Sequence, residues 1–313
     1  MSVPAVKIEN LVKRYKELVA VDHLNLTIES GEVFGLLGPN GSGKTTTINC
    51  LLSLLTYDKG SIEIFGKQMK PDSYELKKLI GVVMQNVAVF EELTVYENID
   101  YFCGLYITDR NQRKEYVEKA IQFVGLEDFK KFYPKKLSGG LLRRLNIACG
   151  IAHKPKLIIL DEPTVAVDPQ SRNKILEGIT HLNKQGATII YTSHYMEEVE
   201  QICTKIAIID KGQNIAMGTK EELKKMIKKS ETIRIDIIDV SDEDLSALRQ
   251  LPHVYEVTFK NHQLQILCSG GKHNLIHILS YLQGKEYSFG HVYSELPSLN
   301  DVFLEITGKE LRD

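Results

Sequence analysis

Hydrophobic and polar residues alternate over the first part of the chain, whereas later segments contain unbroken apolar runs. Alternation over residues 6–11 and short apolar segments within residues 18–28 predict β-strands. Apolar runs over residues 33–37, 79–84 and 157–160 are typical of strands that are buried on both faces of a parallel sheet. We therefore expect an α/β fold.

Residues 86–155 follow a helical period instead. Thr94 and Glu97 form a capping-box pattern at the start of one helix, and Gly125 ends a second helix that is expected over residues 114–124. This stretch therefore predicts a helical subdomain. The strands expected after it cover residues 187–191, 205–210 and 214–217.

The pattern of hydrophobic and polar residues changes near Ser230, where a second domain is expected to begin. A lysine-rich helix is expected over residues 219–229, with its charged side chains in solvent. The residues after it follow the order strand, helix, strand, strand, helix, strand, which is that of the ferredoxin-like fold. The expected organisation is a first domain over 1–218, a linker helix over 219–230 and a small α+β domain over 231–313. His273 and His277 share one predicted helix face, but without a third ligand they do not predict a metal site.

Composition excludes several classes of protein. The chain has 313 residues, of which 43% are hydrophobic and 26% charged, and its formal net charge of −2 excludes a surface devoted to polyanions. Five cysteines without paired spacing favour free thiols over a disulfide framework or a zinc site. No run reaches the roughly 18 apolar residues that span a bilayer, so we expect a chain that does not cross a membrane by itself.

A glycine-rich loop stands between a predicted strand and a predicted helix. The residues Gly38-Pro39-Asn40-Gly41-Ser42-Gly43-Lys44-Thr45 match the phosphate-binding loop at each fixed position, and Thr46 continues into the helix. The glycines let backbone N–H groups face an anion, and the positive end of the helix lies at the same place. Lys44 is expected to reach the β- and γ-phosphates of a nucleotide, and the Thr45 hydroxyl is expected to hold Mg²⁺.

Polar side chains follow the ends of the predicted parallel strands, where α/β sheets bind ligands. Gln85 ends one strand, Asp161 and Glu162 follow a second, and His194 follows a third. Asp161 suits a partner of Mg²⁺, and Glu162 suits a base that polarises water. A histidine at a strand end is often structural, but His194 falls at the same edge and is expected to contact the γ-phosphate.

Two further features have two interpretations each. Tyr15 either stacks on a purine ring or covers an edge strand. Ser138 either caps a helix in the ordinary way or, with Gly139 and Gly140, also leaves the N–H groups of the first turn open to an anion. The second interpretation of Ser138 gives the chain two helix N-termini shaped for phosphate.

In combination, these residues resemble those of ABC-type ATPase subunits. The resemblance rests on the phosphate loop, Gln85, Leu137-Ser138-Gly139-Gly140, Leu157–Glu162, Asp168 and His194, and it covers about residues 5–218. It implies a P-loop NTPase fold with a RecA-like core, an antiparallel β subdomain and a helical subdomain. It also implies a dimer in which each ATP lies between the phosphate loop of one subunit and the Ser138-Gly139-Gly140 cap of the other.

The resemblance also implies roles for the site residues, with ATP and Mg²⁺ as cofactors. The implied catalytic residues are Glu162, which activates water, His194, which steadies the γ-phosphate, and Gln85. The implied nucleotide contacts are Tyr15, Gly38, Pro39, Asn40, Gly41, Ser42, Gly43, Lys44, Thr45, Thr46, Ser138, Gly139, Gly140 and Asp168. The implied Mg²⁺ partners are Thr45, Gln85 and Asp161. Leu141 stands where the family commonly has glutamine. Because the Ser138 hydroxyl and the glycine N–H groups are still present, the contact across the dimer is expected to persist with some change in its details.

The C-terminal residues resemble a particular group of ABC-type ATPase subunits. Residues 296–308, together with 141–144 and 165–169, look like those of the ATP-binding subunits of ABC-2-type exporters, including the daunorubicin-resistance and sodium-efflux types. In that group the membrane-spanning permease is a separate polypeptide. The resemblance therefore implies a peripheral subunit on the cytoplasmic face of the membrane, which pairs with a second copy or a similar ATPase and docks the permease through residues 85–106.

Three alternatives stay open. A soluble ABC ATPase acting on nucleic acid or ribosomes is expected to show a second module, a coiled-coil insertion, zinc cysteines or a basic stripe, and none is visible, so no nucleic-acid partner is expected. A regulatory subunit with negligible hydrolysis is disfavoured by the intact Glu162. An importer ATPase is disfavoured by the tail and by Leu141.

Overall fold

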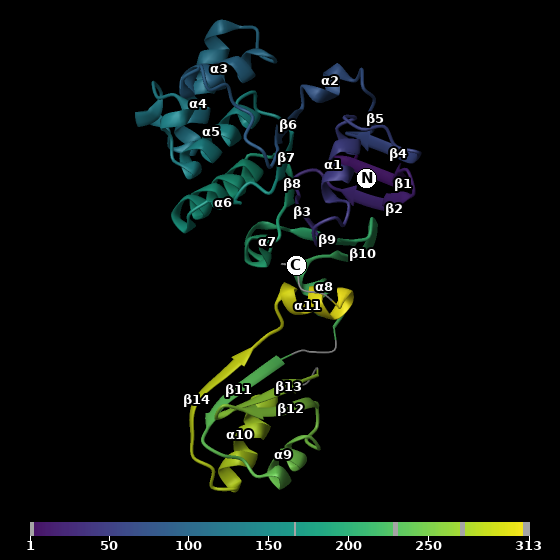
Figure 1. The fold of residues 1–313 in the computed structure, drawn as a ribbon, viewed down its shortest axis with the longest axis vertical. Helices are drawn as coiled ribbons and strands as arrows, with labels where there is room; N and C mark the ends of the chain where they lie inside the picture. The colour runs from purple at the N-terminus through teal and green to yellow at the C-terminus, as the bar shows by residue number, and fades with distance from the viewer. Residues whose placement is uncertain (1–2, 166, 228–230, 270–272, 309–313) are drawn as a thin grey trace. The chain divides into compact units, whose positions relative to one another are not determined.

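The computed structural model describes residues 3–165, 167–227, 231–269 and 273–308. Within these residues the chain divides between Thr219 and Lys220 into two compact units (Figure 1). Each unit has its own cluster of buried hydrophobic side chains. We refer to them as the N-terminal unit and the C-terminal unit.

A six-stranded sheet forms the centre of the N-terminal unit, with the strand order β10-β9-β3-β8-β7-β6 (Figure 1). Its strands are β3 (Val33–Leu37), β6 (Ile80–Val83), β7 (Leu157–Asp161), β8 (Thr188–Thr192), β9 (Lys205–Asp210) and β10 (Gln213–Gly218). Only the edge strand β10 pairs in the antiparallel sense. Every residue of β3, β7 and β8 is buried, which explains why these strands are apolar runs without alternation.

A second, antiparallel sheet has the strand order β2-β1-β4-β5. Its strands are β1 (Val6–Tyr15), β2 (Leu18–Ile28), β4 (Lys59–Ile64) and β5 (Lys67–Gln68). One buried cluster joins this sheet, through Val6 and Leu24, to Ile48 of helix α1 (Lys44–Leu51) and to Ile159 of the central sheet. The hydrophobic effect therefore holds α1, which begins at the glycine-rich loop, firmly between the two sheets.

The segment predicted to be helical contains α3 (Val95–Gly104), α4 (Arg110–Val124) and α5 (Gly139–Ile151), preceded by the short α2 (Tyr74–Lys77). The predicted capping box is confirmed, because Thr94 and Glu97 make both reciprocal bonds at the start of α3. Helix α4 begins at Arg110, earlier than the predicted residue 114, because the Asp109 side chain caps it by accepting the N–H of Gln112. Gly125 ends α4, as predicted, and the structure shows it in the left-handed conformation.

For the N-terminal unit, one local prediction is wrong and one helix was not predicted. Strand β6 ends at Val83 rather than at Gln85, because the carbonyl groups of Met84 and Gln85 accept hydrogen bonds from the Arg143 guanidinium. The sequence also did not predict helix α7 (Met196–Ile202), which follows β8. The remaining helix described in this unit is α6 (Pro169–Lys184), whose N-cap is Asp168.

The C-terminal unit contains the predicted alternation of strands and helices: β11 (Glu231–Ile237), α9 (Asp242–Leu248), β12 (Val254–Lys260), β13 (Gln263–Cys268), α10 (Asn274–Gly284) and β14 (Phe289–Glu295). The sheet order is β12-β13-β11-β14, with all pairs antiparallel, as the ferredoxin-like order requires. Alternate residues such as Ile233 and Ile235 of β11 are buried with Ile278 and Leu282 of α10. Two helices, α8 (Lys220–Lys224) and α11 (Leu299–Thr307), contact each other in the same unit.

The lysine-rich helix is shorter than predicted, since α8 ends at Lys224. Lys228, Lys229 and Ser230, like Ala166 and residues 309–313, lie outside the described residues. All five cysteines are described and buried, and none of them is in a disulfide bond. In the part of the chain that the structure describes, no helix is long and apolar enough to cross a membrane, and no three His, Cys, Asp or Glu side chains are grouped as a metal site.

Candidate functional site

The glycine-rich loop leads from the end of β3 into α1, and two of its glycines stand where no larger residue fits. A Cβ atom on Gly38 would lie 2.2 Å from the carbonyl oxygen of Ile209. Gly43 has a φ of +105°, and a Cβ there would lie 2.5 Å from the carbonyl oxygen of Ala20. The loop is therefore packed tightly against β2 and β9, and this packing fixes its curvature.

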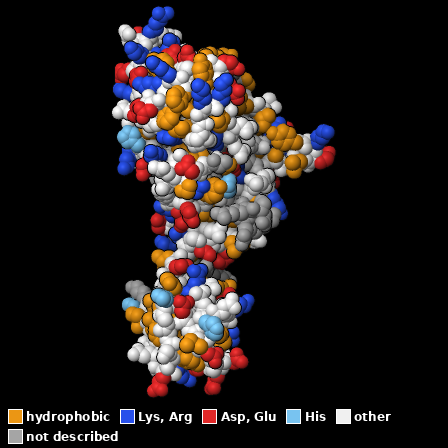
Figure 2. All heavy atoms as spheres, turned by 60° about the vertical axis from the view of Figure 1, so that its left-hand side comes forward, with side chains coloured by type: hydrophobic (Ala, Val, Ile, Leu, Met, Phe, Trp, Pro, Cys, Tyr) orange, Lys and Arg blue, Asp and Glu red, His pale blue; other side chains and the backbone are white. Residues whose placement is uncertain are grey.

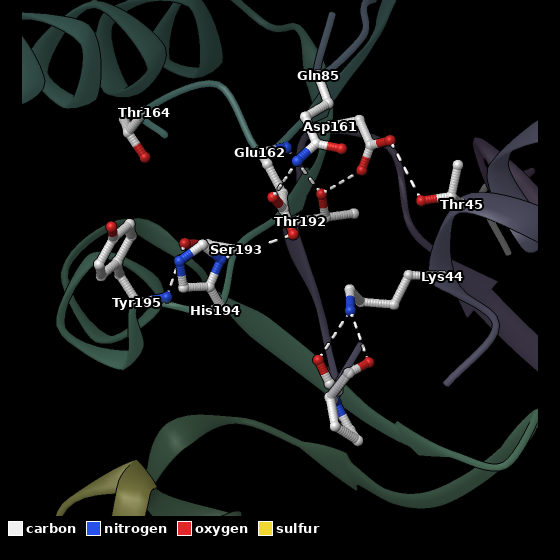
Figure 3. Close-up of polar contacts among 12 residues, drawn as sticks. Lys44, Thr45, Gln85, Asp161, Glu162, Thr164, Thr192, Ser193, His194 and Tyr195 are labelled. Carbon is white, nitrogen blue, oxygen red and sulfur yellow. Dashed lines mark hydrogen bonds and ion pairs between the residues drawn. The ribbon is translucent and has the colours of Figure 1, made fainter. Parts of the chain in front are cut away.

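Lys44 is the first residue of α1, and its side chain folds back over the loop. Its Nζ donates to the carbonyl oxygens of Gly38 at 2.8 Å and Pro39 at 3.0 Å (Figure 3). Burial lowers the pKa of Lys44, and the charges of Glu162 and Asp161 oppose that shift. The loop thus holds a largely buried ammonium group beside the N-terminus of a helix, which suits an anionic ligand.

Asp161, the last residue of β7, lies between two threonine hydroxyl groups. Thr192 at the end of β8 donates to Asp161 Oδ1 at 2.6 Å, and Thr45 of α1 lies with its hydroxyl 3.5 Å from Asp161 Oδ2 (Figure 3). Carboxylate and hydroxyl oxygens are the ligands that Mg²⁺ prefers. Thr45 and Asp161 therefore fit the predicted magnesium site, and Gln85 contacts Glu162 rather than Asp161.

Glu162 follows Asp161 with an unusual backbone conformation. Its φ is +48°, and its N–H donates to the hydroxyl oxygen of Thr192 at 2.9 Å. Gln85 Nε2 donates to Glu162 Oε2 at 2.9 Å, and His194 Nδ1 lies 3.6 Å from Oε1 (Figure 3). Strands β6, β7 and β8 are neighbours, so residues that follow their ends meet around this one carboxylate.

A cavity of about 420 Å³ connects the loop with Tyr15. The predicted residues that line it are Tyr15, Asn40, Gly41, Gly43, Lys44, Thr45, Thr46, Gln85 and Glu162. Tyr15 is 43% exposed, and the ammonium of Lys13 lies 5.1 Å from the centre of its ring. One end of the cavity therefore offers an aromatic face and the other an anion-binding loop.

The second predicted phosphate-shaped helix end lies elsewhere in the unit. The Ser138 hydroxyl caps α5 by accepting the N–H of Leu141 at 3.3 Å. Asp168 caps α6 by accepting the N–H of Ser171 at 2.9 Å, and this bond lowers the pKa of Asp168. A Cβ on Gly140 would lie 3.0 Å from Asp168 Oδ2, so the two helix ends adjoin. Among the described residues that line the 420 Å³ cavity, none comes from Ser138, Gly139, Gly140 or Asp168.

Sequence reasoning missed three residues that shape the site. Arg143 of α5 is 4% exposed, and its guanidinium donates to the carbonyl oxygens of Met84, Gln85, Glu162 and Pro163. Thr192 connects Asp161 with Glu162, and Lys211 lines the cavity. Arg143 binds backbone carbonyl groups, and Thr192 binds residues that are distant in the sequence, so no local sequence pattern indicated either residue. The burial of Arg143 is likewise visible only in the folded structure.

Comparison with known proteins finds family matches in both parts of the chain. Residues 21–165 match the family described as ABC transporter, and residues 218–307 match the family described as ATP-binding protein DrrA1-3-like, C-terminal domain. The linearmycin resistance ATP-binding protein LnrL of Bacillus subtilis (strain 168) is 38% identical over 97% of this chain and 99% of its own length. A Nod factor export ATP-binding protein I of Ralstonia nicotianae is 33% identical over 100% of this chain and 96% of its own.

Solved structures share the fold of a large part of this chain. The ATP-binding cassette MJ0796, solved as a dimer in a post-hydrolysis state with ADP and Pi, is 28% identical and has a TM-score of 0.63. That likeness covers 68% of this chain and 98% of the cassette. An ATP-binding subunit of an ABC transporter gives a TM-score of 0.66 at 23% identity, which shows the fold alone.

Proposed function

The chain belongs to the ABC transporter ATP-binding family, and from this premise we propose that it hydrolyses ATP to power export through a separate membrane-spanning protein. The observation that carries the proposal is that Glu162, contacted by Gln85 and His194, lines the same cavity as Lys44. The relatives named for resistance and export match along the whole chain. Together with the DrrA1-3-like C-terminal match, they favour an exporter over the soluble ATPase alternative.

We expect ATP to bind in the cavity with its adenine near Tyr15 and its phosphates on the glycine-rich loop. The adenine ring would stack on the half-exposed Tyr15, and the phosphates would lie on the loop from Gly38 to Thr46, where N–H groups and the buried ammonium of Lys44 provide positive charge. Gly38 and Gly43 pack against carbonyl groups of β9 and β2, and this packing restrains the loop before a ligand binds. Binding therefore costs little reorganisation of the protein.

Mg²⁺ fits between Thr45 and Asp161. Thr192 binds one oxygen of the Asp161 carboxylate and thereby turns the other toward Thr45. In this position the ion would neutralise charge on the β- and γ-phosphates. Burial of Asp161, which is 3% exposed, keeps its orientation fixed.

Glu162 is placed to accept a proton from the attacking water. Gln85 donates to one carboxylate oxygen, which orients the group and leaves the other oxygen directed toward His194. With Nδ1 of His194 facing Glu162, we assign the second ring nitrogen to the γ-phosphate. The left-handed backbone at Glu162, held by Thr192, sets the direction of the carboxylate.

A second subunit would complete each nucleotide site. The cap at Ser138-Gly139-Gly140 has free N–H groups at a helix N-terminus but does not line the cavity of its own chain. In a two-fold dimer it would face the phosphates bound to the partner, as the family's sandwich arrangement requires. The similar cassette MJ0796 was solved as a dimer, which supports the pairing of two subunits. The partner would be a second copy or a similar ATPase subunit.

The helical part of the N-terminal unit offers a surface for the membrane partner. Phe90, Tyr101 and Leu105 are each more than 40% exposed, and the rings of Phe90 and Tyr101 are in contact at 5.0 Å between centroids. Figure 2, which turns this part of the unit toward the viewer, shows hydrophobic side chains between charged ones. Because this segment follows Gln85, docking here would connect the permease to the catalytic site and place the chain at the cytoplasmic face of the membrane.

The test is Glu162→Gln, which keeps the shape of the side chain but removes the base. We expect the variant to bind Mg-ATP, to release no phosphate and to accumulate as a dimer in size-exclusion chromatography. Glu127→Gln, an exposed position in the 3₁₀ turn Glu127–Phe129, is the control and should hydrolyse ATP like the wild type. Turnover by Glu162→Gln at the wild-type rate would remove Glu162 from its role.

A further inference from the structure

Glu198 of α7 is a buried acidic residue that the proposed mechanism does not use. It is 3% exposed, and its Oε2 accepts hydrogen bonds from three hydroxyl groups. These come from Thr164 Oγ1 at 2.9 Å, Tyr191 OH at 2.6 Å and Ser193 Oγ at 2.8 Å. A carboxylate surrounded in this way holds several segments of the chain in fixed positions.

One cation compensates the buried charge. Arg172 Nε of α6 lies 3.3 Å from Glu198 Oε1. Tyr191 remains a donor, because burial and the Glu198 charge raise its pKa well above the ordinary value. Three hydroxyl donors and one cation therefore satisfy a carboxylate that would be costly to bury without partners.

The donors to Glu198 come from the two segments that carry the catalytic candidates. Thr164 stands two residues after Glu162, and Ser193 directly precedes His194 (Figure 3). Ser193 Oγ also accepts the N–H of Tyr195 at 2.9 Å, so it fixes the turn on both sides of His194. Glu198 thus ties the turn after Glu162 to the turn that contains His194.

Arg172 connects the same network to the ring of His194. Its guanidinium lies 4.7 Å from the ring centre of Tyr195, and that ring lies 4.2 Å from the ring of His194. Arg172 belongs to the first turn of α6, where its N–H bonds to the carbonyl of Asp168 at 2.9 Å. The imidazole is therefore held from behind by an aromatic ring that the Glu198–Arg172 pair supports.

We infer that Glu198 is a positioning residue for ATP hydrolysis, which sets the relative placement of Glu162 and His194 through Thr164, Ser193 and Arg172. The inference rests on the roles proposed above for Glu162 and His194. Glu198 is not among the described residues that line the nucleotide cavity, so its loss should affect the chemical step more than ATP binding. A displacement of about 1 Å between reacting groups lowers a rate by up to roughly 100-fold.

The experiment compares Glu198→Gln with Glu197→Gln in the full-length chain, assembled with its membrane partner where turnover requires it. Glu197 is exposed on the same helix and is the matched control. We expect kcat of Glu198→Gln to fall by about 10- to 100-fold with little change in KM for ATP, and that of Glu197→Gln to stay at the wild-type value. Adding His194→Ala to Glu198→Gln should lower kcat by less than the product of the two single effects.

Two results would overturn the inference: a folded Glu198→Gln variant with wild-type kcat, or single effects that multiply fully in the double variant. If Glu198→Gln does not fold, Ser193→Ala and Thr164→Val remove one donor each, and they should show the same fall in kcat at unchanged KM; wild-type kcat in both would also reject the inference. Failure of the proposed function is distinguishable, because only then does Glu162→Gln retain turnover.

Discussion

The hydroxyl group of Thr192 donates a hydrogen bond to Asp161 Oδ1 at 2.6 Å, and its oxygen, Thr192 Oγ1, accepts one from the N–H of Glu162 at 2.9 Å. A single buried side chain on β8 therefore orients both acidic residues at the end of β7. It turns the Asp161 carboxylate toward Thr45 and holds the left-handed backbone at Glu162. The proposed magnesium ligand and the proposed base thus depend on one hydroxyl group.

Thr192→Val should disturb the orientation of both Asp161 and Glu162, because valine has the same shape as threonine but lacks the hydroxyl group. The buried partners would lose a donor and an acceptor, at a cost of about 1–3 kcal/mol in the free energy of unfolding. We expect ATP hydrolysis to require a higher Mg²⁺ concentration, measured by Mg²⁺ titration of phosphate release. Thr192→Ser keeps the hydroxyl and is the control. An unchanged Mg²⁺ dependence in the valine variant would show that Thr192 does not orient Asp161.

Gly43→Ala and Gly41→Ala form a matched pair in the phosphate loop. Both glycines have a positive φ, of +105° and +77°, so each alanine adds about 1–2 kcal/mol of backbone strain. Only at Gly43 would the new Cβ meet another atom, the Ala20 carbonyl oxygen at 2.5 Å, whereas nothing lies within 4 Å at Gly41. Thermal unfolding should therefore show a larger loss of stability for Gly43→Ala. Equal losses would contradict the tight packing of the loop against β2.

Gly139→Glu tests the contact between subunits. The new carboxylate would repel the phosphates bound to the partner, while the nucleotide cavity of its own chain would be untouched. We expect ATP affinity of the single chain to stay unchanged and the ATP-dependent dimer of the Glu162→Gln background to disappear, as seen by light scattering. Gly139→Ala, which adds size without charge, should impair dimerisation less. A Gly139→Glu chain that still dimerises would argue against the sandwich arrangement.

His153 should make stability depend on pH. Burial lowers its pKa from 6.5 to about 4, with a partial opposite effect from the bond between Nε2 and the Ile80 carbonyl at 3.1 Å. The unfolded chain therefore takes up a proton below about pH 6.5 that the folded chain does not, and stability falls as the pH drops from 6.5 to 4. The loss is about 3 kcal/mol.

The control for this effect is His153→Phe, which keeps the stacking on the Tyr106 ring that lies 4.1 Å from His153. Its thermal midpoint, followed from pH 7 to 4, should fall less steeply than that of the wild type. Parallel curves for the two proteins would assign the pH dependence to other groups.

Much of the site was predictable because its residues stand at positions that local sequence defines. The phosphate loop is contiguous, and the helix caps at Thr94 and Ser138 depend on residues three positions apart. Gln85, Glu162 and His194 were expected to converge because the carboxyl ends of parallel strands share one edge, and the structure brings them into contact. Their catalytic and binding roles remain predictions that the variants above address.

The sequence by itself determined most of the strands and helices, though not α7 (Met196–Ile202), and it determined where the loop for phosphate lies and that a second α+β unit follows the first. Only the tertiary structure decided how Arg143 came to bind four carbonyl groups beside β6 and β7, and why Thr192 and Glu198 hold the acidic end of β7 in place. The physical reason is that backbone conformation follows from neighbours in sequence, whereas these bonds depend on the order β8-β7-β6 in the sheet. No local pattern of residues specifies that order.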